Sequence, residues 1–154
     1  MKGYIMRKRL WIATLLTAGL LGAMPAANAA DIEVLMLNKG EKGGMVFQPD
    51  LIMAAPGDVI TFVATDKGHN VESIDGMLPD GVEEFKSKMN KDFVLTVEKD
   101  GVYGVKCTPH YGMGMIALIS VGEPTNIEAA RAVKQKGKAK SRFQDVFAEY
   151  DAAK

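Results

Sequence analysis

The nine residues Cys107–Met115, with the sequence CTPHYGMGM, hold the side chains with the most distinctive chemistry in the chain. They include the only cysteine, one of only two histidines, and the methionines Met113 and Met115. A thiolate, an imidazole and a thioether are ligands of a soft metal, and copper sites that exchange electrons combine one thiolate with two imidazoles and a weak axial thioether. The second histidine, His69, lies 38 residues before Cys107. The chain therefore predicts a mononuclear copper site, provided that the fold returns His69 to this loop.

Each of these residues has a simpler interpretation when it is taken alone. A single buried cysteine is usually a small apolar side chain, and methionines usually fill the core. Structural zinc prefers more cysteine or histidine ligands and has no use for methionine. A Cys–His hydrolase needs a third, orienting polar residue, which the loop does not supply. Together, the only cysteine and a histidine three residues later in a Gly/Pro loop favour a metal.

The axial ligand has two candidates, because Met113 and Met115 follow His110 at different spacings. The longer loop lets the second methionine reach the metal as the next strand begins, so we favour Met115. On the other side of the site, we expect Asn70 to tie the His69 loop to the Cys107 loop by hydrogen bonds, and a backbone N–H to the thiolate sulfur to tune the redox potential.

The elements that position this site read as short strands. Alternating or β-branched apolar residues predict strands over 32–37, 59–65, 93–97, 102–107 and 115–121, with a short strand over 71–73. Residues 45–55 are extended and interrupted by Pro49, whereas 38–44 is rich in turn residues and reads as a loop. Several short strands separated by Gly and Pro turns indicate a β-sandwich or barrel.

The end of the chain changes from strands to helices. Thr125–Glu128 has the pattern of a capping box and predicts a helix with Ile127, Ala130 and Val133 on one face. After a lysine-rich linker over 134–140, a second amphipathic helix places an apolar face against the sandwich. That face consists of Phe143, Val146, Phe147 and Tyr150.

Residues 1–29 have the form of a secretory signal peptide. A basic start with Lys2 and three cations at 7–9 precedes an apolar run over 10–24 and an A-x-A pattern at Ala27 and Ala29, and either Met1 or Met6 fits as the start. The run is shorter than the ~20 residues of a spanning helix. Cleavage after Ala29 leaves one domain, 30–154, with 15 basic and 19 acidic residues, a net charge of −4. This balance gives no support for nucleic-acid binding, and the cysteine count permits no internal disulfide.

The chain resembles the cupredoxins, and among them the pseudoazurins. The resemblance covers nearly all of 30–154 and includes the segments MLNKG (36–40), MVFQP (45–49), PGD (56–58), DKGHNVE (66–72), FKSK (85–88) and 103–115. It implies an all-β fold, an eight-stranded Greek-key β-sandwich over 30–122 with two C-terminal α-helices over about 125–152. It also implies one type 1 copper ion, held by His69, Cys107, His110 and Met115.

The resemblance further implies a monomeric periplasmic carrier of single electrons, without catalytic activity and without membrane attachment after processing. Expected partners are copper nitrite reductase, in denitrification, or c-type cytochromes. These would dock on lysines near the site, here Lys39, Lys67, Lys86 and Lys106. A copper storage or delivery protein is the alternative, although such proteins favour accessible, exchangeable sites rather than one enclosed loop.

Overall fold

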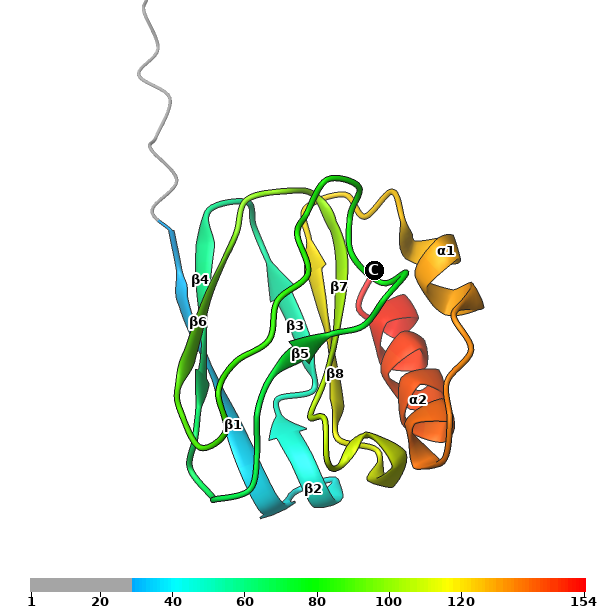
Figure 1. Cartoon of the computed structure of the whole chain (residues 1–154). Coiled ribbons are helices and arrows are strands. Elements are labelled where there is room, and N and C mark those ends of the chain that lie inside the picture. Colours follow the sequence, from blue (N-terminus) through cyan, green and yellow to red (C-terminus); the bar gives the residue numbers. More distant parts are fainter. Residues whose placement is uncertain (1–28) are drawn as a thin grey trace, which may run out of the picture.

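Eight strands form two four-stranded sheets in the computed structural model, which describes residues 29–154 (Figure 1). The first sheet has the order β2 (Gly43–Gln48), β1 (Asp31–Gly40), β4 (Asp58–Val63) and β6 (Phe93–Val97). The second has the order β3 (Leu51–Ala54), β8 (Ile116–Val121), β7 (Gly101–Lys106) and β5 (Glu72–Ser73). The predicted signal peptide lies outside the described residues except for Ala29. Within 29–154, no helix combines the length and apolarity needed to cross a bilayer.

The main core lies between the two sheets, as the alternation of apolar residues predicts. Val34 of β1, Phe62 of β4, Val105 of β7 and Ile119 of β8 are all buried there. Every residue of β8 is buried, because its other face is covered by helices rather than by water. Strand β8 therefore has no solvent-exposed face, since it packs between the main core and the helices.

Two C-terminal helices cover the outer face of the second sheet (Figure 1). They are α1 (Ile127–Ala132) and α2 (Lys138–Ala152). The predicted apolar face of α2 is confirmed, since Phe143, Val146, Phe147 and Tyr150 are buried. The ammonium of Lys42 lies 2.7 Å from the Glu149 carboxylate and so ties α2 to the β1–β2 hairpin.

Two local predictions were wrong. Residues 38–44 are not a loop, because β1 continues to Gly40 and pairs with Gly43 across a two-residue turn. Backbone pairing needs no side chains, so glycines there did not prevent strands. The capping box does not form either. Asn126 precedes α1 without capping it, and its side chain instead accepts from the Val102 N–H at 2.7 Å and donates to the Val102 carbonyl at 3.0 Å.

The strand register explains how His69 returns to the Cys107 loop. Strand β5 is antiparallel to β7, with Glu72 opposite Lys106. Continuing that register past the end of β7 places Asn70 opposite Thr108, with His69 one residue farther along. The loop after β4 and the loop after β7 therefore meet at one end of the sandwich.

Candidate metal centre

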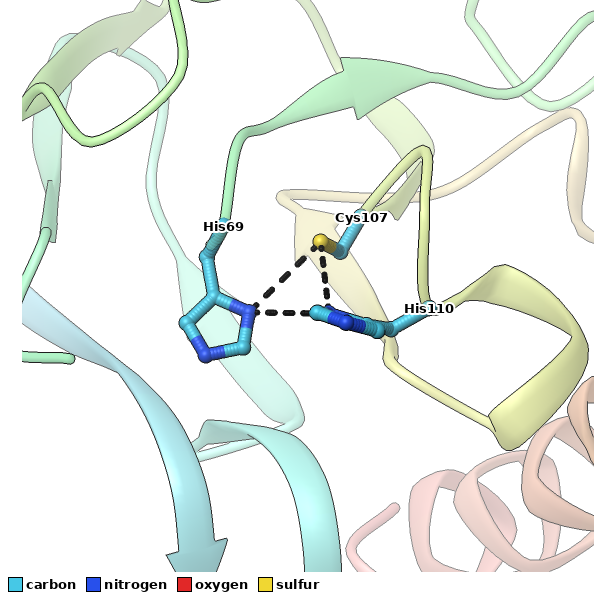
Figure 2. A group of neighbouring side chains, drawn as sticks. All are labelled: His69, Cys107 and His110. Atoms are coloured by element: carbon cyan, nitrogen blue, oxygen red, sulfur yellow. Dashed lines mark hydrogen bonds between the residues drawn. The ribbon is translucent and has the colours of Figure 1, made fainter. Parts of the chain in front are cut away.

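His69, Cys107 and His110 come together at this end of the sandwich, as Figure 2 shows. The Cys107 Sγ atom lies 3.7 Å from Nδ1 of His69 and 3.6 Å from Nδ1 of His110. The two Nδ1 atoms are 3.1 Å apart. His69 and Cys107 are buried, whereas His110 is partly exposed. The structure thus brings together the three residues that the sequence singled out first.

The triangle of donor atoms has the size of a metal site. The point equidistant from its corners lies about 2.0 Å from each, which compares with bonds of ~2.0–2.1 Å from a transition metal to imidazole nitrogen and ~2.3 Å to thiolate sulfur. One thiolate and two imidazoles around such a point are the donors that copper electron-transfer sites use. The residues present therefore fit a single copper ion.

The His69 ring is oriented by a residue that the sequence did not point to. Nε2 of His69 lies 3.0 Å from Oδ1 of Asn38, which can only accept, so Nε2 carries the hydrogen and Nδ1 presents its lone pair to the site. Burial, followed by the neighbouring His110, lowers the pKa of His69 below its ordinary value of 6.5. Burial and the neighbouring His110 thus keep the imidazole neutral, as a metal ligand must be.

The Cys107 thiol lies in surroundings that oppose its ionisation until a metal binds. Burial raises its pKa, while hydrogen bonds from the backbone N–H groups of Asn70 and His110 lower it. Those donors match the expected backbone N–H to the sulfur. They stabilise a thiolate once a cation has displaced the proton.

Asn70 joins the two loops as the sequence analysis expected. Its Oδ1 accepts from the Thr108 N–H at 2.8 Å, and its Nδ2 donates to the Thr108 hydroxyl at 2.9 Å. The Thr108 hydroxyl in turn donates to the Glu72 carboxylate. Asn70 is 1% exposed and so is shielded from water, whereas Thr108 at the other end of the bracket is exposed. Sequence reasoning missed the Glu72 link, because it depends on the β5–β7 register.

The two candidate methionines differ sharply in their surroundings. Met115 is fully buried in the same core cluster as Cys107, and its backbone N–H and carbonyl bond to His110 and Cys107 at 3.2 and 3.0 Å. Met113 is 50% exposed. Of the two, only Met115 is buried in the core beside Cys107.

The four lysines of the predicted docking surface differ in whether they form ion pairs. Within residues 29–154, Lys39 and Lys67 form no ion pair and are exposed. Lys86 and Lys106 instead lie 3.3 and 3.8 Å from the two oxygens of Glu72. Glu72 therefore partly neutralises half of the predicted lysine set.

Comparison with known proteins agrees with this geometry. Residues 34–122 match the family model "Copper binding proteins, plastocyanin/azurin family". A pseudoazurin of Paracoccus pantotrophus is 54% identical over 133 residues, which cover 86% of this chain and 92% of that protein. A pseudoazurin of Methylorubrum extorquens is 46% identical over 138 residues, covering 89% of this chain and 93% of that protein.

Solved structures show the same likeness in three dimensions. The crystal structure of pseudoazurin from Methylobacterium extorquens AM1 matches with a TM-score of 0.76 and 47% identity, covering 78% of this chain and 98% of that one. Native pseudoazurin from Hyphomicrobium denitrificans matches with a TM-score of 0.75 and 43% identity, at 78% and 98% coverage. The predicted fold class is thereby confirmed. The chain belongs to the plastocyanin/azurin family of copper-binding proteins and, within it, to the pseudoazurins.

Proposed function

We propose that this protein carries single electrons through one type 1 copper ion bound by His69, Cys107, His110 and Met115. The observation that supports this most is the triangle of Sγ and two Nδ1 atoms, whose sides of 3.1–3.7 Å match one transition-metal ion. Copper supplies the redox chemistry by cycling between Cu(I) and Cu(II). The buried Met115 would supply the fourth ligand, and four protein ligands would leave no open position for a substrate, which argues against an enzyme.

The protein contributes a framework that holds its ligands still. Cu(I) and Cu(II) prefer different geometries, so ligands that cannot move keep the reorganisation between the two states small. Asn38 fixes the His69 ring, and Asn70 fixes the Cys107 loop through Thr108. Electrons enter and leave through the His110 ring, because His110 is partly exposed whereas His69 and Cys107 are buried.

Redox partners dock around His110 on a surface with local positive charge. The domain over 30–154 is net acidic, at −4, yet four lysines lie close to the ligands in sequence or through their contacts. Lys67 and Lys106 are within two residues of His69 and Cys107, Lys39 follows the Asn38 that bonds to His69, and Lys86 pairs with Glu72. Such a patch steers acidic partners mainly through the association rate. By family resemblance the partners are copper nitrite reductase or c-type cytochromes. The protein would act as a monomer in the periplasm, after residues 1–29 have been removed.

Voltammetry of the copper-loaded domain over 30–154 tests the carrier proposal. We expect a reversible one-electron wave, and retention of the metal in both oxidation states when a Cu(I) chelator is added. A copper storage or delivery protein would instead give up Cu(I) to the chelator and show no reversible wave. That outcome would replace the carrier with the alternative.

A further inference from the structure

The loop that carries His110 also contacts the C-terminal helical segment, which the metal site does not use. Tyr111 begins the short 3-10 turn η1 (Tyr111–Met113), and its hydroxyl donates to Oε1 of Gln135. Gln135 lies in the linker between α1 and α2, where its Nε2 donates to Sδ of Met77 at 3.2 Å and to the Val133 carbonyl at 3.3 Å. The linker is thus anchored on the sandwich side and reaches out to the ligand loop.

A second contact brings the two backbones together without side chains between them. Gly137 has a φ of +56°, and a Cβ there would lie 2.5 Å from the Gly112 carbonyl oxygen and 3.1 Å from its Cα. Gly114 has a φ of +94°, and its Cβ would meet Lys138 at 3.4 Å. Glycines at these positions permit the close approach. In Figure 1 the start of α2 lies beside the turn that follows β7.

The Tyr111 ring is held between two cations from different elements. Nζ of Lys106, in β7, is 5.4 Å from the ring centroid, and Nζ of Lys136, in the linker, is 5.5 Å from it. Both distances lie within the range of a cation–π contact. The ring therefore bridges β7 and the linker, while its hydroxyl bonds to Gln135.

The two histidines differ in how their rings are held. Among the described residues, His69 has a hydrogen-bond partner on both ring nitrogens, whereas Nε2 of His110 has none. Outside the donor triangle, the hydrogen bonds that hold His110 are therefore those of its backbone. The His110 carbonyl accepts from the N–H groups of Met113 and Met115 at 3.0 and 3.2 Å, so η1 and His110 move together.

We propose that Tyr111, Gln135 and Gly137 are positioning residues that clamp η1 and thereby fix His110 at the metal centre. The C-terminal segment of this chain then has a role beyond covering the second sheet. It holds the His110 loop in place through Tyr111 and Gln135, whereas the His69 ring is held directly by Asn38. The value of the clamp for electron transfer rests on the proposed copper function, but the clamp itself is a property of the polypeptide.

Amide hydrogen exchange of the metal-free domain over 30–154 tests the clamp. Tyr111→Phe keeps the ring between its cations and removes one hydrogen bond, so we expect about two- to tenfold faster exchange at the Met113 and Gly114 amides. The matched control is Tyr103→Phe. It removes a buried hydroxyl that donates to the Lys99 carbonyl at 2.9 Å, at the opposite end of β7, and should leave those amides unchanged.

A second variant, Gln135→Leu, removes the partner instead of the hydroxyl and should accelerate the same amides. In the copper-loaded domain, Tyr111→Phe and Gln135→Leu should alter the relative intensities of the visible bands, whereas Tyr103→Phe should not. Unchanged exchange in both loop variants, or equal acceleration by Tyr103→Phe, would overturn the clamp. Because exchange is measured without metal, that failure is distinct from a wild-type protein that does not turn blue, which would overturn the copper proposal.

Discussion

The bracket formed by Asn70 gives a direct test of how the two ligand loops are joined. Asn70→Ala removes both the acceptor of the Thr108 N–H and the donor to the Thr108 hydroxyl. The hydroxyl still donates to Glu72, and Thr108 is exposed enough for water to reach the freed N–H. The expected loss is therefore that of two neutral hydrogen bonds, without the penalty of an unsatisfied buried group.

Each such bond contributes about 1 kcal/mol, so Asn70→Ala should lower the free energy of unfolding by about 2 kcal/mol. With a urea m-value of about 2 kcal/mol/M, the midpoint of unfolding moves down by about 1 M while m stays constant. Thr108→Val is the matched variant. It keeps the backbone N–H that Asn70 accepts, but its lost hydroxyl both accepts from Asn70 and donates to the Glu72 carboxylate, so it should move the midpoint by at least as much as Asn70→Ala.

Urea titration of the metal-free domain over 30–154, followed by circular dichroism, measures both shifts. Working without copper separates the bracket from the binding energy of the metal. A midpoint for Asn70→Ala that stays within about 0.2 M of the wild-type value would refute the two-bond bracket. A changed m-value would show that the variant alters the unfolded or native ensemble rather than the bracket alone.

Three further predictions concern the fourth ligand, the docking charges and the stability in acid. Met115→Leu conserves volume and should cost less than about 1.5 kcal/mol of stability, yet change the visible bands of the copper protein, whereas Met113→Leu should leave them unchanged. Glu72→Gln releases two lysine charges and should raise the association rate with an acidic partner several-fold at low ionic strength, while Lys106→Glu should lower it, with neither altering the spectrum. Because burial lowers the pKa of His69 below 6.5, the unfolded chain binds a proton that the folded chain does not, so the metal-free protein should lose stability as pH falls below about 6.5.

Each of these has a result that would contradict it. Equal spectral changes in the two methionine variants would remove Met115 as the preferred ligand. Association rates independent of both charge changes at low salt would remove the lysine patch. Urea midpoints that stay constant from about pH 7 to about pH 5 in the metal-free protein would mean that His69 titrates alike in both states.

The sequence predicted the parts of the site that depend on short spacings. Cys107 and His110 are three residues apart, so one loop had to place both side chains at the same end of a strand. His69 followed from counting strands, and Asn70 from its place beside His69. The apolar face of α2 was equally predictable, because its spacing is that of a helix packed on one side.

The remaining contacts depend on which distant segments meet, and no local pattern encodes that. Asn38 orients His69 only because β1 passes beside the loop that follows β4. The capping box predicted from Thr125 and Glu128 does not form, and α1 begins after Asn126, whose side chain bonds to the backbone of β7. The approach of Gly137 to Gly112 is likewise invisible in sequence, where both glycines read as ordinary turn residues.

The central claim is that one copper ion occupies the His69, Cys107, His110 and Met115 set. The most direct test is to titrate the purified metal-free domain over 30–154 with Cu(II) while recording the visible spectrum. We predict an intense blue thiolate-to-copper charge-transfer band that saturates at one ion per chain and is abolished by Cys107→Ser. A colourless or weakly coloured product, or saturation at more than one ion with the colour retained in Cys107→Ser, would contradict the account.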